Sequence, residues 1–320
     1  MLAQQILTGD RRALAKAITL VESTRADHGE QAVQLLAELM HHTGKSIRLG
    51  VSGAPGVGKS TFIEALGNYL TGQGYQVAVL AVDPTSAVSG GSILGDKTRM
   101  ETLSVNPKAF VRPSPAGTTL GGVTRRTRES LLLCEAAGYD VIIVETVGVG
   151  QSETAVSDMT DMFLLLLSPG GGDDLQGIKR GIMELADLVL VNKADGDQAN
   201  MANQTVSDYR GALQFMQART PSWTPQVSTC SALQHQGIEQ AWETMLQFKT
   251  ALTESGELET LRAQQARAWM WAETTEALVA DLKNQPQVKA LVPELEQAVL
   301  AGELPAIVAA QRLIAQYKSQ

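Results

Sequence analysis

Seven short, mostly apolar runs, separated by stretches with helical spacing, are the feature that most constrains how this chain folds. Their sequences are IRLGVSG, QVAVLAVD, AFVRPS, DVIIVET, MFLLLLS, LVLVNKAD and PQVSTCSA. Most are apolar at successive positions, which is typical of strands covered on both faces of a sheet. Alternation of such strands with helices predicts an α/β fold with a doubly wound, mostly parallel sheet. Ligands then bind at the carboxyl ends of the strands.

Two flanking regions carry helical patterns without strands. Near the N-terminus, one helical face is expected to contain Leu14, Ala17, Ile18 and Val21, and another Val33, Leu36, Ala37 and Met40. After about residue 256, helical spacing relates Leu258, Leu261, Ala268 and Ala272. We therefore expect a helical extension in residues 1–45, the sheet domain in residues 46–255 and a helical region in residues 256–320. Trp269 and Trp271 in the last region suit both a helix packed on its own domain and an arm exchanged with a second subunit.

Composition argues against several classes of partner, although a local basic patch remains possible. A net charge of −8 over 320 residues gives no general field for nucleic acid or anionic lipid. The N-terminus lacks the apolar core of a secretion signal, and MFLLLL is too short to cross a bilayer. We therefore expect a cytoplasmic protein that contacts neither nucleic acid nor membrane. Cys134 and Cys230 show no metal or disulfide spacing and are expected to be buried thiols.

The stretch GAPGVGKST, residues 53–61, follows a predicted strand and precedes a predicted helix. It matches G-x-x-x-x-G-K-[ST] in the context that this motif requires. Gly53, Gly56 and Gly58 let the backbone wrap a phosphate, together with Ala54, Pro55 and Val57. Lys59 can then bridge the β- and γ-phosphates, Ser60 can bind Mg²⁺, and Thr61 can contact the α-phosphate. This stretch predicts a nucleoside triphosphate site.

The stretch NKAD at the end of LVLV predicts which base is bound. The carboxylate of Asp195 can accept hydrogen bonds from N1–H and the 2-amino group of guanine, whereas adenine has neither donor. Asn192 can shape the same pocket, and the methylenes of Lys193 can cover the base. SAL, residues Ser231, Ala232 and Leu233, can offer its backbone to guanine O6. GTP and GDP are therefore the expected ligands.

A third motif, ETVG, lies between these two at the end of DVIIV. GTPases commonly carry D-x-x-G here, so Glu145 is expected to hold Mg²⁺, directly or through water, and the Gly148 amide to contact the γ-phosphate. A carboxylate that caps the following helix is the alternative. Val149 stands where many GTPases place a water-orienting Gln. Gln151 lies two positions further on, so we expect slow intrinsic hydrolysis.

Two further carboxylates are candidates for the metal site. Asp83 ends the run QVAVLAVD, and Asp96 lies in the loop GGSILGDKTR. Either side chain can reach the metal or its waters. Asp96 has a competing role as N-cap of a helix that begins at KTRMETL.

Together, the motifs GAPGVGKST, VDPTS, GGSILGDKTRM, ETVGVGQSE, GGGDDLQGIKRG, NKAD and SAL resemble the MeaB/ArgK family of P-loop GTPases, over nearly all of residues 1–320. The resemblance implies a G-domain related to those of nickel-inserting metallochaperones, with a C-terminal dimerisation arm and hence a homodimer. It also implies a partner, adenosylcobalamin-dependent methylmalonyl-CoA mutase, which such proteins protect and whose cofactor delivery they gate. By the same resemblance, phosphate and Mg²⁺ are bound by Lys59, Ser60, Asp83, Asp96 and Glu145.

The segment GGGDDLQGIKRG is expected to respond to nucleotide and partner. Its three glycines allow several backbone states, and Lys179 and Arg180 can exchange partners with Asp173, Asp174 or a phosphate. A plain flexible loop is the alternative. Two other functions stay open. One is an ATP-dependent kinase serving uptake of basic amino acids, against which NKAD argues. The other is a metal-inserting chaperone, for which the four histidines offer no shared site.

Overall fold

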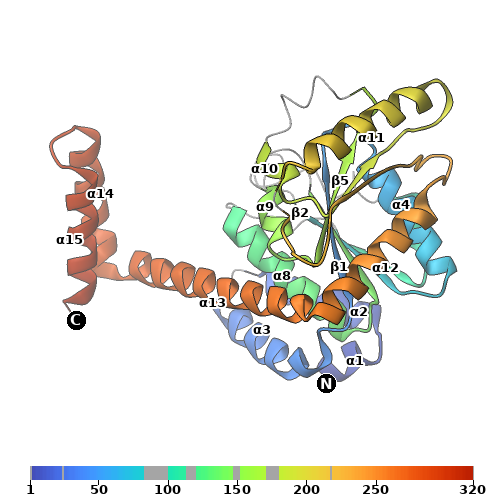
Figure 1. Ribbon diagram of the computed structural model, residues 1–320. Helices are drawn as coiled ribbons and strands as arrows, with labels where there is room; N and C mark the ends of the chain where they lie inside the picture. Colours follow the sequence, from blue (N-terminus) through green and yellow to red (C-terminus); the bar gives the residue numbers. More distant parts are fainter. Residues whose placement is uncertain are drawn as a thin grey trace. The chain divides into compact units, whose positions relative to one another are not determined.

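A computed structural model describes residues 2–23, 25–82, 100–112, 120–146, 152–170, 180–216 and 218–319 (Figure 1). The chain divides into two compact units, Met1–Arg262 and Ala263–Gln320. The first unit contains the sheet and all the motifs above. The described part of the second unit is helical.

Within the described residues, seven parallel strands form one sheet in the order β3-β2-β4-β1-β5-β6-β7. The strands are β1 (Ile47–Gly53), β2 (Val77–Val82), β3 (Ala109–Arg112), β4 (Val141–Thr146), β5 (Met162–Leu167), β6 (Leu188–Val191) and β7 (Gln226–Thr229). Each lies in one of the seven apolar runs, and the predicted parallel α/β class is confirmed. Since β1 lies between β4 and β5, its carboxyl end is at a topological switch point, where such sheets bind ligands.

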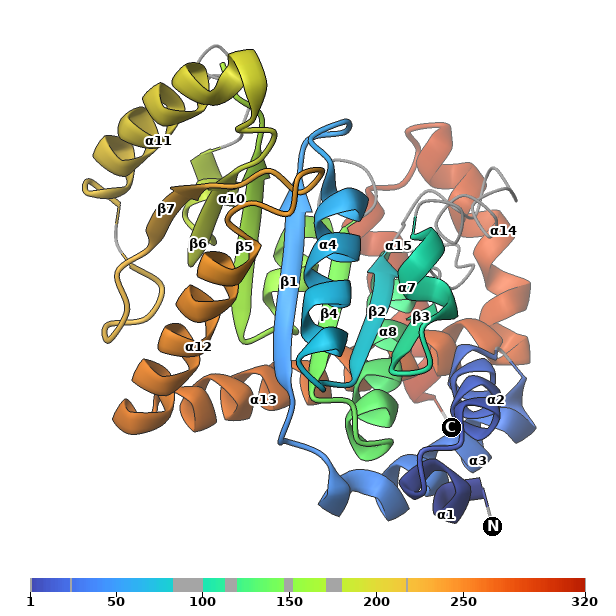
Figure 2. The ribbon, with the colours of Figure 1, turned by 90° about the vertical axis from the view of Figure 1, so that its right-hand side faces the viewer.

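Helices cover both faces of the sheet (Figure 2). One face packs against α4 (Lys59–Gly72), α7 (Glu101–Val105) and α12 (Ile238–Ser255), the other against α8 (Leu120–Ala136) and α9 (Ser152–Ser157). Helix α10 (Arg180–Met183) precedes β6 in the chain, and η3 (Gly196–Gln198) and α11 (Ala199–Leu213) follow it. Covering on both faces explains why the strands are apolar at successive positions.

Before the sheet come α1 (Leu2–Leu7), α2 (Arg11–Glu22), α3 (Ala26–Leu39) and η1 (Met40–His42). The side chain of Asp10 caps α2 by accepting hydrogen bonds from two amides of its first turn. The expected apolar face of α2, containing Leu14, Ala17, Ile18 and Val21, is buried as predicted.

The face predicted for α3 is wrong. Val33 and Met40 are 63% and 53% exposed, whereas Ala32, Leu35 and Leu39 are buried. The apolar stripe of this helix is wide enough to contain two overlapping sets of residues with helical spacing. Packing against α2 and α8 decides which of the two is covered.

In the second unit, the end of α13 (Glu257–Asn284) leads to α14 (Pro286–Leu300) and α15 (Ala306–Lys318). α14 and α15 pack on each other and bury Val288, Leu295 and Ala309. Ala268 and Ala272 of α13, which share helical spacing with Leu258, are exposed. Among the described residues, every helix is too short or too polar to cross a bilayer.

Buried carboxylates lie at the amino ends of the strands. Asp161, just before β5, pairs with Arg262 at 2.7 Å. Asp187, just before β6, accepts a hydrogen bond from the Phe163 amide at 2.8 Å. Burial raises the pKa of Asp187 to about 6, although Arg219 at 3.7 Å acts to lower it. These groups fix the edge of the sheet opposite the candidate site.

Candidate functional site

Glycines shape the loop between β1 and α4 where no side chain fits. Gly53 has a φ of +151°, and a Cβ there would lie 2.4 Å from the carbonyl oxygen of Leu166 in β5. Gly58 has a φ of +94°, and its Cβ would lie 2.7 Å from Nδ2 of Asn192. Only glycine suits both positions. A glycine cradle in front of a helix N-terminus has the shape and polarity to hold phosphate.

Lys59 is the first residue of α4. Its Nζ donates to the carbonyl oxygen of Gly53 at 2.7 Å and to that of Ala54 at 3.4 Å. The ammonium group therefore lies over the loop that carries Pro55 and Val57. This is the position from which it would reach a phosphate held by the same loop.

The fold brings Ser60 and Glu145 together, although 85 positions separate them in the chain. The Ser60 hydroxyl donates to Oε1 of Glu145 at 3.3 Å. Glu145 is buried in β4, in register with Val51 of β1 and Ala81 of β2. Its side chain thus reaches the P-loop helix from the strand beside β1. A hydroxyl and a carboxylate oxygen are the ligand types that Mg²⁺ prefers.

Asn192, directly after β6, joins the P-loop to the SAL segment. Its Nδ2 donates to the carbonyl oxygen of Val57 at 2.9 Å, and its Oδ1 accepts from the amide of Ala232 at 3.0 Å. The thiol of Cys230 also approaches Oδ1, at 3.6 Å. Burial raises the pKa of Cys230 to about 12, so the thiol stays protonated at neutral pH. Both cysteines are buried, as predicted.

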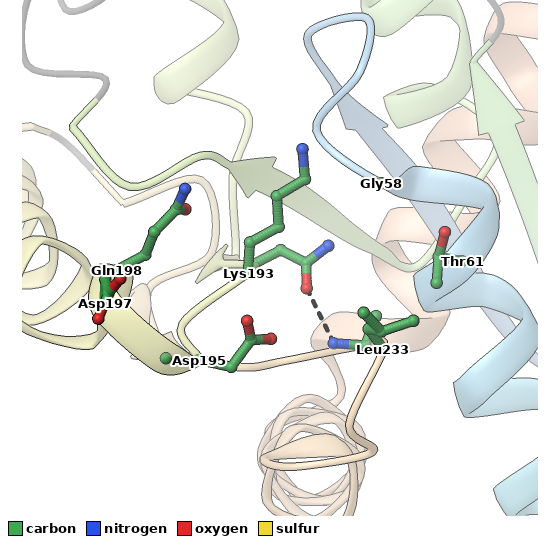
Figure 3. Close-up of a pocket in the computed structure, with 10 residues that line it drawn as sticks. Gly58, Thr61, Lys193, Asp195, Asp197, Gln198 and Leu233 are labelled. Carbon is green, nitrogen blue, oxygen red and sulfur yellow. Dashed lines mark hydrogen bonds between the residues drawn. The ribbon is translucent and has the colours of Figure 1, made fainter.

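A cavity of about 490 Å³ lies between these groups (Figure 3). In Figure 3, Gly58 and Thr61 stand on the α4 side, and Lys193 and Asp195 on the side that follows β6. The carboxylate of Asp195 accepts a hydrogen bond from the Ser231 hydroxyl, which orients it. The P-loop and the NKAD motif, which are far apart in the sequence, therefore line the same cavity.

Lys193 adopts a φ of +61°, which is uncommon for a residue with a side chain. Its Nζ donates to the carbonyl oxygen of Gly56 at 2.7 Å, so the aliphatic part of the side chain extends along the cavity. Leu233, on the SAL side, is 78% exposed and lines the same cavity. These two apolar surfaces are suited to a flat base.

Sequence interpretation missed part of the wall. Gly196, Asp197 and Gln198, which form η3, also line the cavity. The signal available in the sequence was their position, since they directly follow Asp195. These three residues belong to no motif. The turn after NKAD forms part of the cavity wall because its backbone passes there, which does not require a fixed residue type.

Three predicted site residues, Asp83, Asp96 and Gly148, lie outside the described residues, as does most of GGGDDLQGIKRG. The amide of Gly170, where that segment begins, donates to Oγ1 of Thr205 in α11 at 3.2 Å. Gly170 itself is therefore held against the helix that follows the guanine motif.

Comparison with known proteins places these features in a family. Residues 14–287 match the family model described as methylmalonyl Co-A mutase-associated GTPase MeaB. The chain belongs to the MeaB family. It is therefore a GTPase, and the predicted MeaB/ArgK resemblance is confirmed.

Relatives of this MeaB-family chain carry different names. GTPase ArgK of Escherichia coli is 52% identical over 281 residues, which cover 87% of this chain and 84% of that protein. Methylmalonic aciduria type A homolog, mitochondrial, of Mus musculus is 48% identical over 325 residues, covering 98% and 78%. A solved structure described as LAO/AO transport system kinase has a TM-score of 0.78 at 40% identity and covers 99% of this chain and 97% of that one.

Proposed function

We propose that this chain is a Mg²⁺-dependent GTP-binding and GTP-hydrolysing switch that serves as a chaperone for adenosylcobalamin-dependent methylmalonyl-CoA mutase. The nucleotide-binding part of the proposal is based on one observation. Gly58 and Thr61 of the P-loop region line the same cavity as Asn192, Lys193 and Asp195. A triphosphate in the glycine cradle would extend its base into this cavity.

Each residue then has a role set by its chemistry. The carboxylate of Asp195, oriented by Ser231, would accept from guanine N1–H and the 2-amino group. Lys193 and Leu233 would cover the base, and the Ala232 segment would offer an amide near O6. Lys59 would neutralise the β- and γ-phosphates, and Thr61 would contact the α-phosphate.

The residues present fit Mg²⁺. Ser60 and Glu145 offer two oxygen ligands 3.3 Å apart, beside a loop in which a Cβ at Gly53 or Gly58 would collide with neighbouring atoms. Bound Mg²⁺ would supply positive charge against the transferred phosphoryl group. By family resemblance, Asp83, Asp96 and the Gly148 amide would complete this side of the site. Glu145 and Lys59 would hold the phosphates and metal in place rather than transfer protons.

The mutase is proposed from the family description and from the names of relatives. The family is described as methylmalonyl Co-A mutase-associated, and the mouse relative is named for methylmalonic aciduria. A switch needs a segment that changes with the nucleotide. The segment of residues 170–181 comes after β5 in the chain, and the amide of its first residue, Gly170, donates a hydrogen bond to Thr205 of α11. The expected compartment remains the cytoplasm.

A homodimer through the C-terminal helices is part of the proposal. Apolar side chains there are unusually exposed for a single chain, with Trp271 59%, Ile307 70% and Leu300 88% exposed. A groove of about 760 Å³ lies in the second unit, lined by Val292, Leu313 and neighbouring residues of α14 and α15. Such surfaces are typical of oligomer interfaces.

The test is GTP hydrolysis by the purified chain, alone and with a methylmalonyl-CoA mutase. We expect slow turnover that requires Mg²⁺ and that the mutase accelerates. Glu145→Ala should lose most of the Mg²⁺-dependent turnover. Turnover unaffected by the mutase would contradict the chaperone role while leaving the GTPase intact.

A kinase that uses ATP is a second candidate, because the solved structure with 40% identity is described as a transport system kinase. The base pocket argues against it, since adenine has neither the N1–H nor the 2-amino group from which Asp195 would accept. Asp195→Asn separates the two. Its amide can donate to the 2-oxo group of xanthine, so the variant should weaken GTP and favour xanthosine triphosphate. Unchanged GTP affinity, or a preference of the wild-type chain for ATP, would refute the base assignment.

A further inference from the structure

Two buried hydroxyl groups join the carboxyl ends of β1 and β4. Oγ1 of Thr146 donates a hydrogen bond to Oγ of Ser52 at 3.0 Å, and the two residues are 0% and 2% exposed. Burying a hydroxyl group destabilises a fold unless the group is hydrogen-bonded, so each of these side chains depends on the other. We call Ser52 and Thr146 the hydroxyl pair.

The hydroxyl pair lies where the backbone pairing of these two strands ends. The last paired residues of β1 and β4 are Val51 and Glu145. With its other neighbour, β5, strand β1 stays paired through Gly53, and β4 stays paired with β2 through Thr146. Backbone pairing between β1 and β4 thus stops one residue before the hydroxyl pair, and the side chains of the pair make the next link between the strands.

This link lies next to both halves of the proposed metal site. Glu145 immediately precedes Thr146, and Ser52 immediately precedes the P-loop, which begins at Gly53. Successive side chains of a strand point to opposite faces of a sheet. Because Glu145 reaches Ser60 of α4 on one face, the hydroxyl pair belongs to the other face. The pair therefore acts on the metal site through the backbone that it holds in place.

The spacing of the two proposed metal ligands depends on this backbone. Ser60 is on α4, which the P-loop connects to β1, whereas Glu145 is on β4. The Ser60 hydroxyl lies 3.3 Å from Oε1 of Glu145, which is long for a hydrogen bond between oxygen atoms. A small displacement of the end of β4 from the end of β1 would change this distance. Mg²⁺ requires nearly ideal octahedral geometry, so its binding is sensitive to such a displacement.

We propose that Thr146 and Ser52 are positioning residues for Mg²⁺ in the GTPase reaction. Their hydrogen bond holds the ends of β4 and β1 at the separation at which Glu145 and Ser60 can bind one metal ion. This role requires a hydroxyl group at position 146, so serine should serve there and valine should not. The inference rests on the proposed function, because that proposal makes Glu145 and Ser60 the metal ligands.

Three variants of the full chain and one control test the hydroxyl pair. Thr146→Val keeps the shape of the side chain but removes the hydroxyl, Thr146→Ser keeps the hydroxyl, and Ser52→Ala removes the same bond from the other strand. Thr160→Val is the matched control. Thr160 is also fully buried, but it lies before the amino end of β5, and its hydroxyl donates to the carbonyl oxygen of Val156 at 2.8 Å. GDP affinity and GTP turnover are measured against Mg²⁺ concentration, with thermal unfolding in parallel.

We expect Thr146→Val and Ser52→Ala each to raise the Mg²⁺ concentration for half-maximal effect on GDP affinity and on turnover roughly threefold to tenfold. GDP affinity without Mg²⁺ should stay within about twofold of wild type. Thr146→Ser should keep the wild-type Mg²⁺ dependence, and Thr160→Val should lower Tm without changing that dependence.

An unchanged Mg²⁺ dependence in Thr146→Val and Ser52→Ala, or the same increase in Thr160→Val, would overturn the positioning role. If Thr146→Val does not fold, Ser52→Ala decides the question, because it removes the same hydrogen bond by a smaller change. Wild-type protein whose GDP affinity and GTP turnover are both independent of Mg²⁺ would overturn the proposed function instead, and this inference with it.

Discussion

Replacing Asn192 by alanine tests how firmly the two halves of the cavity are joined. Its amide group pairs with the carbonyl oxygen of Val57 at 2.9 Å and with the amide of Ala232 at 3.0 Å, and both of these residues are buried. Truncation removes both hydrogen bonds and leaves a buried carbonyl and a buried amide unpaired. At about 1–3 kcal/mol for each of the two unpaired groups, the free energy of unfolding should fall by ~2–6 kcal/mol.

Thermal unfolding and GDP titration measure the two consequences of this change. At about 2–4 °C for each kcal/mol in a unit of this size, the expected loss lowers Tm by about 4–24 °C. GDP affinity should weaken by about tenfold or more, because the P-loop and the base pocket lose their shared support. Asn203→Ala, at an exposed position of α11, is the matched control and should stay within ~0.5 kcal/mol of wild type. An Asn192→Ala protein with the Tm of the control and GDP affinity within about twofold of wild type would refute this reasoning.

Two further changes test the P-loop and the opposite edge of the sheet. Gly53→Ala places a Cβ 2.4 Å from the Leu166 carbonyl oxygen and should cost at least ~3 kcal/mol in denaturant unfolding, whereas Gly29→Ala, at an open helical position, should be neutral or slightly stabilising. Asp187→Asn should flatten the pH dependence of stability. Burial raises the pKa of Asp187 from 3.8 to about 6, so the folded state holds the proton more tightly, and the wild-type chain loses stability as pH rises through this window. The loss is at most ~3 kcal/mol, and an unchanged slope in unfolding series from pH ~4 to ~7 would contradict the assignment.

Much of the fold follows from local pattern. Strands buried on both faces must be apolar at successive positions, so each of the seven runs identifies its strand. The face of α3 does not follow, because Val33 and Leu35 are similar in character and only packing against α2 and α8 separates them. In α2 the set of residues chosen from the spacing is the buried one, whereas in α3 two sets displaced by one position both have helical spacing and the other set is buried.

The sequence also identifies some residues of the candidate site and misses others. Lys59, Ser60 and Asp195 belong to motifs whose chemistry fixes the residue type, so the sequence identifies them. The part of the cavity wall formed by η3 depends on where the backbone passes, and no residue type at those positions indicates a role. Such parts of a site are found only when the fold brings distant segments together.

The position of β1 explains why the motifs converge. Parallel strands end at one edge of the sheet, and β1 has β4 on one side and β5 on the other, with β6 next along. Glu145 therefore reaches Ser60 from one neighbour, while Asn192 reaches the P-loop from two strands away on the opposite side. That second approach requires Gly58, because a Cβ would lie 2.7 Å from the amide nitrogen of Asn192. The glycines of the P-loop thus serve two purposes, since they make room for a phosphate and also let the guanine motif contact the loop directly. Changes in the base pocket should then alter the phosphate site through Asn192, without any movement of the sheet.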